Sequence, residues 1–145
     1  MIDSITEIKE GAVAEAKANR ECLKGTWQEN QGFSVAVTVS AKKTIYLAGV
    51  GAWEDESGNS LAGDFEGQTR FAFRQIGKTL GTLGATLDDI VTMTVFVTDM
   101  QYRRRFIEIR KEHFTSDYPA SALIGVKELA RPPMMIEIQA TAVVD

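Results

Sequence analysis

The sequence predicts an α+β fold, in which one mixed β-sheet carries two helices packed on one of its faces. Three observations predict it. Two segments place apolar residues at helical steps of three and four, several shorter segments alternate apolar and polar residues as strands do, and the helical segments lie between strands. The expected order is strand, strand, helix, strand, helix, strand, strand, and such an order places the helices over the sheet.

The segments before the first helix carry the weaker signals. A short edge strand is predicted near residues 5–8, and residues 12–23 have the composition of a short helix or an ordered loop. Residues 34–39 and 44–48 then alternate apolar and polar side chains. Because the link over residues 41–43 is short, these two strands are predicted to form a hairpin.

The first helix is predicted to begin after Asp64, a residue type that caps helix N-termini, and to end near Gly84. A one-sided stripe recurs between them at steps of three and four. Its members are Phe65, Thr69, Ala72, Ile76, Leu80 and Leu83. This pattern indicates a helix that packs one face on the sheet.

The C-terminal half alternates strand and helix. Strands are predicted at residues 90–98, 122–126 and 135–144, and Asp99 is expected to cap a second helix over residues 100–114. The inner stripe of that helix is Tyr102, Phe106, Ile109 and His113, and the apolar face of the last strand is Ile136, Ile138, Ala140, Ala142 and Val144. The uncovered sheet face mixes small, polar and apolar residues, which favours a subunit interface and predicts an oligomer.

Composition restricts the class of protein. A chain of 145 residues that is 44% hydrophobic suits one domain over residues 1–145. The net charge of -4 disfavours nucleic acid as a partner, and the run of residues 103–105 is interpreted as a solvated helix face. The polar N-terminus shows no signal peptide and no stretch is long and apolar enough for a membrane span, so the cytoplasm is the expected location.

The chain has one cysteine and one histidine, which limits the disulfide, metal and catalytic-triad chemistry that it can support. Cys22 has no partner for an internal disulfide, and His113 alone cannot supply a histidine-based zinc site. A Ser-His-Asp triad would have to use His113 as its base. Because His113 lies on the inner stripe of a helix, it is interpreted as a structural side chain, and no metal site is expected.

Several blocks of the sequence resemble one family. They are GATLDDIVTMTVFVTDM at residues 84–100, YPAS at 118–121, LARP at 129–132 and IEIQA at 136–140. In these blocks and their spacing the chain, from about residue 32 to residue 144, resembles the reactive-intermediate deaminase (Rid, YjgF-type) family. Residues 1–31 have no clear counterpart and are expected to be an atypical N-terminal extension of a single Rid-family domain.

The resemblance implies a fold like that of the trimeric chorismate mutases, in which three copies close a barrel. It implies ligand clefts between neighbouring subunits of a homotrimer. Well-studied members hydrolyse reactive enamines and imines, such as 2-aminoacrylate, to a ketoacid and ammonia, without a metal or organic cofactor. Such a site has to hold a carboxylate, place one water molecule and move protons.

Residue by residue, the resemblance transfers only in part. The glutamate of the last strand matches Glu137, whose expected role is catalytic: it positions or activates the attacking water, the alternative being a solvated or interface glutamate. Gly49 matches a glycine whose backbone N–H binds a ligand oxygen, but Ala48 stands where the family usually has serine.

The largest departure is at Ser121, where the usual Pro-Ala-Arg has become Pro-Ala-Ser. The chain therefore resembles an arginine-lacking branch, because a serine cannot make a charge-assisted fork with a carboxylate. Phe33 stands near a tyrosine position, and Phe33 and Leu123 join Ser121 among the expected substrate-binding residues. Arg131 is a candidate replacement cation; the alternative is a turn arginine bound to a nearby carboxylate or carbonyl.

Two functions stay open at this point. The first is a cofactor-independent hydrolase that deaminates 2-aminoacrylate or a larger unsaturated amino acid such as an aminomuconate, with Trp27, Phe33 and Trp53 as candidates for an aromatic pocket or for plain packing. The second is a small-molecule-binding trimer of the same fold without catalysis. RNA cleavage, attributed to some family members, is disfavoured by the acidic balance, and chorismate mutase activity rests on fold analogy alone.

Overall fold

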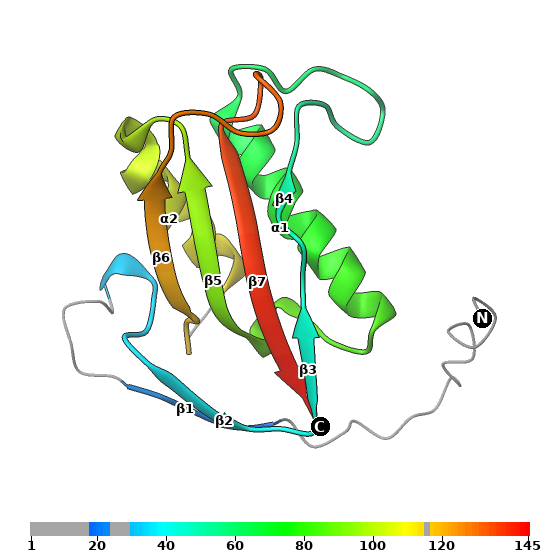
Figure 1. Ribbon diagram of the computed structural model, residues 1–145, viewed down its shortest axis with the longest axis vertical. Coiled ribbons are helices and arrows are strands. Elements are labelled where there is room, and N and C mark those ends of the chain that lie inside the picture. The colour runs from blue at the N-terminus through cyan, green and yellow to red at the C-terminus, as the bar shows by residue number, and fades with distance from the viewer. Residues whose placement is uncertain (1–17, 24–29, 115–116) are drawn as a thin grey trace.

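The computed structural model describes residues 18–23, 30–114 and 117–145 (Figure 1). Two short 3₁₀ turns, Leu87–Asp89 and Met100–Tyr102, precede β5 and α2. The helices and strands are β1 Asn19–Cys22, β2 Val37–Ser40, β3 Lys43–Tyr46, β4 Val50–Gly51, α1 Phe65–Thr82, β5 Ile90–Val97, α2 Arg103–His113, β6 Ala120–Gly125 and β7 Ile136–Val144.

A five-stranded mixed sheet organises the fold. Its order is β3-β7-β5-β6, and β4 also pairs with β7. The β5–β6 pair is parallel, with α2 as its crossover, and the pairs made by β7 are antiparallel. This confirms the predicted mixed sheet, and it places β7 and β5 at the centre and β6 at an edge.

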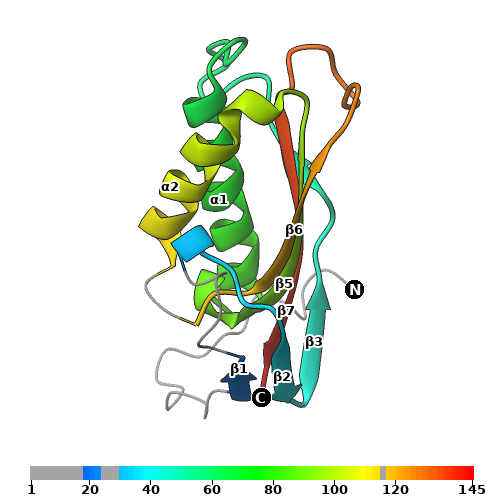
Figure 2. The same cartoon turned by 90° about the vertical axis from the view of Figure 1, so that its left-hand side faces the viewer.

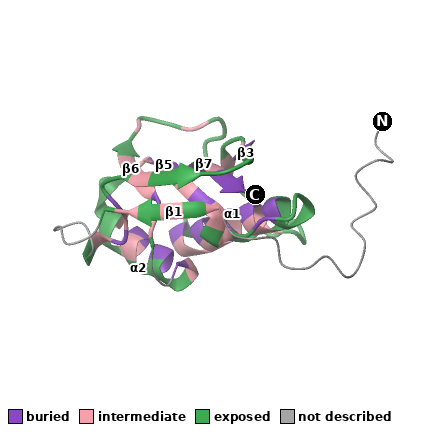
Figure 3. Ribbon diagram, turned by 90° about the horizontal axis from the view of Figure 1, so that it is seen from below, coloured by how far each residue is buried: buried purple, intermediate pink, exposed green. Residues whose placement is uncertain are grey.

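Both helices cover the same face of this sheet, as predicted (Figure 2). The layer between sheet and helices holds the buried apolar side chains (Figure 3). From the helices it takes Phe65, Ala72, Phe73, Ile76, Leu80, Phe106 and Ile109, and from the central strands Met93, Val95, Val97, Ile136, Ile138, Ala140 and Ala142. The predicted inner faces of α1 and β7 are therefore confirmed except at Leu83, which is the C-cap of α1 and is exposed because the helix ends at Thr82.

The predicted Asp64 cap is confirmed, whereas Asp99 caps the 3₁₀ turn Met100–Tyr102 and not α2 itself, whose N-cap is Tyr102. The Asp64 side chain accepts a hydrogen bond from the Gly67 backbone N–H at the start of α1, and Asp99 accepts one from the Gln101 N–H. Each bond satisfies a backbone donor that the first helical turn leaves unpaired. In the described ranges neither helix is long and apolar enough to cross a bilayer.

The predicted hairpin is wrong. The strand β2 pairs with β1 in a separate two-stranded sheet, and β3 pairs with β7, where Ile45 stands opposite Ala142. The nine-residue β7 offers a long partner edge, and Ile45 buries itself there against the core, whereas β2 stays largely exposed. Pairing along β7 thus overrides the short link that favoured local pairing.

The N-terminal expectations have mixed outcomes. Residues 19–22, expected to be helical or an ordered loop, form the strand β1, because pairing with β2 outweighs their helix propensity. The edge strand expected near residues 5–8 and the aromatic candidate Trp27 lie outside the described residues.

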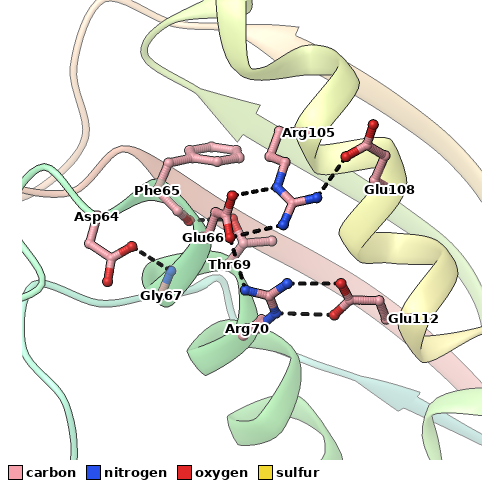
Figure 4. Close-up of polar contacts among 9 residues, drawn as sticks. All are labelled: Asp64, Phe65, Glu66, Gly67, Thr69, Arg70, Arg105, Glu108 and Glu112. Atoms are coloured by element: carbon pink, nitrogen blue, oxygen red, sulfur yellow. Dashed lines mark hydrogen bonds and ion pairs between the residues drawn. The ribbon is translucent and has the colours of Figure 1, made fainter.

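An ion network joins the exposed surfaces of α1 and α2 (Figure 4). Arg105 donates to Glu66 and Glu108, and Arg70 donates to Glu66 and, through two bonds of 2.8 and 3.0 Å, to Glu112. The Arg105 guanidinium, followed by that of Arg70, lowers the pKa of Glu66 to about 2. Arg105, one member of the basic run, is therefore paired with carboxylates, as the interpretation of a solvated helix face required.

Candidate functional site

Glu137 lies on the sheet face that the helices leave uncovered. It is the second residue of β7, and the buried Ile136 and Ile138 on either side of it point toward the helices. Its cross-strand neighbours are Gly51 on β4 and Phe96 on β5. The side chain is half-buried, so its carboxylate lies at the surface of the sheet and within reach of a ligand.

Gly49 lies directly against this carboxylate. A Cβ built on Gly49 would stand 3.0 Å from the Glu137 Cδ and would overlap its Oε1. Glycine is therefore the one residue that leaves room for the carboxylate at this spot. The structure brings together the predicted catalytic residue and one predicted substrate-binding residue, with exposed backbone beside the acid.

Arg131, the candidate replacement cation, lies in the turn before β7 and contacts Trp53; its role toward a ligand stays a prediction. Its guanidinium carbon lies 4.5 Å from the ring centroid of Trp53, in a cation–π contact. Both side chains are exposed. The expected alternative, a bond to a nearby carboxylate or carbonyl, is absent among the hydrogen bonds and ion pairs of the described residues, because the aromatic face supplies the partner.

The other predicted binding residues line a separate pocket of about 180 Å³ at the edge of the sheet. Phe33, Ser121 and Leu123 all contribute to it. Its remaining walls come from Gln31 and from one side of α2. The residues of α2 that line it, Arg103, Ile107 and Arg110, recur at steps of four and three.

Phe33 reaches this pocket because its segment pairs with the edge of the sheet. Ser34 forms a parallel bridge with Ala120 at the start of β6, and its backbone N–H donates to the carbonyl of Pro119. On the other side, Lys111 of α2 donates to the carbonyl of Asn30. The segment is thus held between β6 and α2, and the pocket lies between them.

Arg110 is the functional candidate that the sequence analysis missed. Only 3% of it is exposed, although it lines the pocket. Its Nη1 donates to Ser121 Oγ at 2.9 Å and its Nη2 donates to the Gln31 carbonyl at 2.8 Å. Burial lowers the pKa of Arg110 to about 10, so the guanidinium still carries its charge at neutral pH. The signal was present: steps of four and three from Arg103 place Ile107 and Arg110 on one face.

Glu137 and the pocket residue Ser121 lie on opposite faces of the sheet. Cross-strand neighbours share a face, so Ser121, opposite the buried Met93, faces the helices, whereas Glu137, opposite Phe96, faces away. Two strand spacings and three residues separate the two positions, roughly 14 Å between Cα atoms. A single chain therefore does not present both groups to one small ligand.

The described residues form no candidate metal site. Among residues 18–23, 30–114 and 117–145, no cluster of three histidine, cysteine or acidic side chains is arranged to hold a metal ion. His113 instead stacks on Phe73, with 4.4 Å between the ring centroids. This stacking agrees with its interpretation as a structural side chain.

Comparisons with known proteins agree with this fold. The family model described as Endoribonuclease L-PSP, the YjgF/Rid family, matches residues 27–144. The chain is 31% identical over 111 residues to the human 2-iminobutanoate/2-iminopropanoate deaminase, covering 77% of this chain and 79% of that protein. It is 29% identical over 104 residues to a RutC family protein of Pyrococcus horikoshii, covering 72% of this chain and 82% of that one.

Solved structures show the same architecture. A Rid family protein of unknown function from Yersinia pestis, YyfB, superposes with a TM-score of 0.77 at 27% identity, covering 87% of this chain and 99% of that one. A YjgF/YER057c/UK114 family member from Mycobacterium tuberculosis superposes with a TM-score of 0.58 at 29% identity, covering 87% and 100%. The predicted YjgF-like fold is confirmed.

Proposed function

The chain belongs to the YjgF/Rid family, and from this premise we propose that it is a cofactor-independent hydrolase that deaminates a reactive enamine or imine. The observation that carries the proposal is the pairing of Glu137 with Gly49 on the uncovered sheet face. A carboxylate beside exposed glycine backbone provides a proton acceptor and an N–H donor at one spot. Those are the groups that the hydrolysis of a carbon–nitrogen double bond requires.

The proposed reaction has three steps. An enamine such as 2-aminoacrylate is protonated at its terminal carbon and becomes an iminium. Water then adds to the iminium carbon while Glu137 accepts one proton of the water, which gives a carbinolamine. Glu137 then passes its proton to nitrogen and the carbon–nitrogen bond breaks as ammonia leaves. The hydroxyl oxygen releases its proton to solvent as it forms the carbonyl of the ketoacid, which balances the proton added to the terminal carbon. The protein contributes position and proton transfer, and no electrons are exchanged.

We propose that the complete cleft forms between two copies of the chain, in a homotrimer. The opposite facing of Glu137 and Ser121 supports this, because a neighbouring copy is needed to bring both groups to one ligand. The uncovered sheet face supports it too, since Tyr46 is 82% exposed there beside Thr92 and Gln139. A flat face of this kind is suited to burial against an identical chain.

The proposed substrate class is a small unsaturated or imino acid that carries a carboxylate. The human relative is named for 2-iminobutanoate and 2-iminopropanoate, which belong to this class. The pocket beside Ser121 has apolar walls from Phe33, Ile107 and Leu123, which suits a hydrocarbon chain next to a charged end. A larger unsaturated amino acid, such as an aminomuconate, is the second member of the class to test.

RNA cleavage, which the family description names, is not proposed. The net charge is -4, and Arg105 of the basic run is engaged by Glu66 and Glu108. A phosphate backbone binds best to a stripe of unpaired cations. The non-catalytic alternative, a trimer that only binds a small acid, is separated from the proposal by the experiment below.

The test measures ammonia release. The 2-aminoacrylate or 2-iminobutanoate is generated in place by a dehydratase acting on serine or threonine, and the rate of ammonia formation above the spontaneous rate is recorded. We expect turnover in the wild type, and in Glu137→Gln a fall of about 100-fold or more, which is typical for removal of a general base.

Glu128→Gln is the matched control, because Glu128 is an exposed glutamate outside the site. Its activity should equal that of the wild type, and all three proteins should elute as the same oligomer. Unchanged activity in Glu137→Gln contradicts the catalytic role. Saturable binding of the ketoacid product without turnover of any substrate in the class would leave the binding-only alternative.

A further inference from the structure

Arg110 combines burial with an unneutralised charge. Only 3% of it is exposed, and its guanidinium carbon lies 4.8 Å from the Phe106 ring centroid and 5.8 Å from that of Phe33. Its two hydrogen bonds go to Ser121 Oγ and the Gln31 carbonyl, both of them neutral acceptors. Among the described residues it makes no ion pair, and no carboxylate lines the pocket, whose other charged residue is the cation Arg103.

Such an arrangement has a physical cost. A guanidinium moved out of water loses solvation that neutral acceptors replace only in part, and buried charges in proteins are ordinarily paired with an opposite charge. Arg105, five residues earlier on the same helix, shows that pairing: two carboxylates bind it. The contrast indicates that the partner of Arg110 comes from outside the described part of the chain.

Arg110 also keeps donors in reserve. A guanidinium has five N–H groups, and the bonds to Ser121 and Gln31 use one on each terminal nitrogen. Its Nε is buried and has no hydrogen-bond partner in the part of the chain that the structure describes. Because Ser121 Oγ accepts from Arg110, its own O–H proton is left to donate to a second acceptor. An anion at this position would therefore satisfy the charge and several donors together.

The pocket in front of Arg110 suits one class of anion. Its volume is about 180 Å³, and three of its seven lining residues, Phe33, Ile107 and Leu123, are apolar. Apolar walls strengthen a charge interaction at the closed end because they exclude water. A small carboxylic acid with a short hydrocarbon chain matches both features, whereas a free inorganic anion leaves the apolar walls uncovered.

The position within the fold adds a separate argument. Ser121 occupies the place where the resemblance expects a strand arginine, and Arg110 reaches that same place from α2, with 2.9 Å between its Nη1 and Ser121 Oγ. The serine is short enough to leave the space that the helix arginine fills. The guanidinium of Arg110 therefore stands beside the strand position from which the resemblance expects an arginine side chain to project.

We propose that Arg110 of α2, assisted by the Ser121 hydroxyl, binds the carboxylate of the ligand in this pocket and replaces the strand arginine that the chain lacks. The identity of the ligand as a small imino or keto acid rests on the proposed function. The assignment of Arg110 as the anion-binding residue rests on the contacts and burial above.

The experiment compares two probes that differ in one charge, 2-oxobutanoate and 2-oxobutanamide. Their dissociation constants are measured by titration calorimetry at pH 7 and fixed salt. We expect the wild type to prefer the carboxylate by about 10- to 100-fold, as for a charge-assisted fork. In Arg110→Met the preference should fall to within about twofold, because the apolar contacts remain and the charge is gone.

Two further variants make the result specific. Arg105→Met removes an equal charge from the same helix and should leave the preference unchanged. Arg110→Met/Ser121→Arg places the guanidinium on the strand instead and should restore the preference. A loss of packing alone would affect both probes equally and would not be rescued from β6, so rescue separates anion binding from a purely structural role.

Ser121→Asp keeps the test decisive if Arg110→Met fails to fold. The new carboxylate would stand beside Arg110 and occupy the place of the ligand's carboxylate, so the preference for 2-oxobutanoate should be lost in a well-folded protein. The neutral Ser121→Asn is its control and should retain most of the preference.

The binding experiment on Arg110 can succeed or fail independently of the ammonia-release experiment on the proposed deaminase. A carboxylate preference that persists in Arg110→Met or in Ser121→Asp overturns the assignment, whether or not the enzyme turns over. Equal binding of both probes by the wild type overturns it as well. Loss of the preference in Arg110→Met, with rescue by the double variant and no ammonia release from any substrate, supports Arg110 and refutes the deaminase.

Discussion

The two halves of the candidate site are built differently. The acidic half, Glu137 beside Gly49, is half-buried on a sheet face that no helix covers. The cationic half, Arg110 with Ser121, is enclosed behind the edge strand and walled by aromatic and aliphatic side chains. The half proposed to act on water is open to it, whereas the half proposed to bind the carboxylate is largely closed to water, which strengthens attraction between opposite charges.

The two halves also differ in the face of the sheet on which they lie. Glu137 and Ser121 face opposite sides of the sheet, so the two halves of one chain serve different clefts if each cleft is made by two copies. The predictions that follow test this separation first and then the physical character of each half, from the largest expected effect to the smallest.

Mixing two inactive variants should restore activity. Glu137→Gln lacks the acid and Arg110→Met lacks the cation, so each oligomer alone should be nearly inactive. In an equal mixture with free subunit exchange, the chance that a cleft draws an intact acid from one subunit and an intact cation from its neighbour is one half times one half. About a quarter of wild-type activity is therefore expected in a closed ring of subunits.

Co-expression with two different affinity tags, followed by purification of the hybrid, provides the measurement. Because this removes the unmixed trimers, the expected activity rises to about a third, one intact cleft of the three in the ring. The control is an oligomer purified in the same way from two differently tagged forms of Glu137→Gln, and it should stay inactive. If the hybrid of the two different variants is also inactive while it keeps the oligomeric state, both residues belong to the same cleft of one chain and the comparison between halves is wrong.

A methyl group at Gly49 should disturb the acidic half alone. The Cβ of Gly49→Ala would overlap the carboxylate of Glu137, which has to move away, while the flexible end of that side chain can yield without unfolding the sheet. A displacement of about 1 Å can lower a rate about 100-fold, so a fall in kcat of about 10- to 100-fold is expected with binding of 2-oxobutanoate retained.

Gly77→Ala is the matched substitution, because a Cβ there would meet only Leu87, at an ordinary 3.8 Å. It should leave turnover unchanged and stabilise α1 by up to about 1 kcal/mol. Steady-state kinetics and thermal unfolding of both variants provide the comparison. Equal kcat values for Gly49→Ala and the wild type would show that turnover does not depend on the position of the Glu137 carboxylate against residue 49.

Much of the acidic half could be predicted from the sequence, and the cationic half could not. Alternation along residues 136–144 gives the facing of Glu137 directly, and Gly49 followed from the resemblance. Arg110 was hidden because its recognition depends on the pairing of residues 30–34 with β6, a contact between segments about 80 residues apart. Nonlocal pairing of the same kind also defeated the predicted hairpin at β3, where β7 is the partner.

A negative charge inside the cationic half should stabilise the folded chain. In Ser121→Asp the new carboxylate would lie beside the Arg110 guanidinium and neutralise a charge that has no ion-pair partner among the described residues. We expect the free energy of unfolding to rise by about 1–2 kcal/mol relative to Ser121→Asn, at one protein concentration. Urea denaturation measures this difference, and a lower stability of Ser121→Asp would mean that Arg110 already has an anionic partner.

The smallest effect concerns His113, one turn beyond Arg110 on α2. Burial against Phe73, with lesser contributions from Arg70 and Arg74, lowers the pKa of His113 below 6.5, and Glu112 opposes the shift. The unfolded chain therefore binds a proton more readily than the folded one as pH falls from about 7 to 5. The folded state is favoured fully above the unfolded pKa, and this contribution is lost progressively as the pH drops toward the lowered folded pKa.

His113→Phe keeps an aromatic ring on Phe73 and removes the titration, so its free energy of unfolding should depend less on pH between 5 and 8 than that of the wild type. Urea denaturation at several pH values measures the two slopes. Arg110 keeps its charge at neutral pH, whereas burial lowers the pKa of His113 and so favours its neutral form. If the free energy of unfolding of the two proteins depended equally on pH, the C-terminal end of α2 would be more hydrated than its packing indicates. Water would then also reach the neighbouring Arg110 pocket, which contradicts the comparison between the two halves.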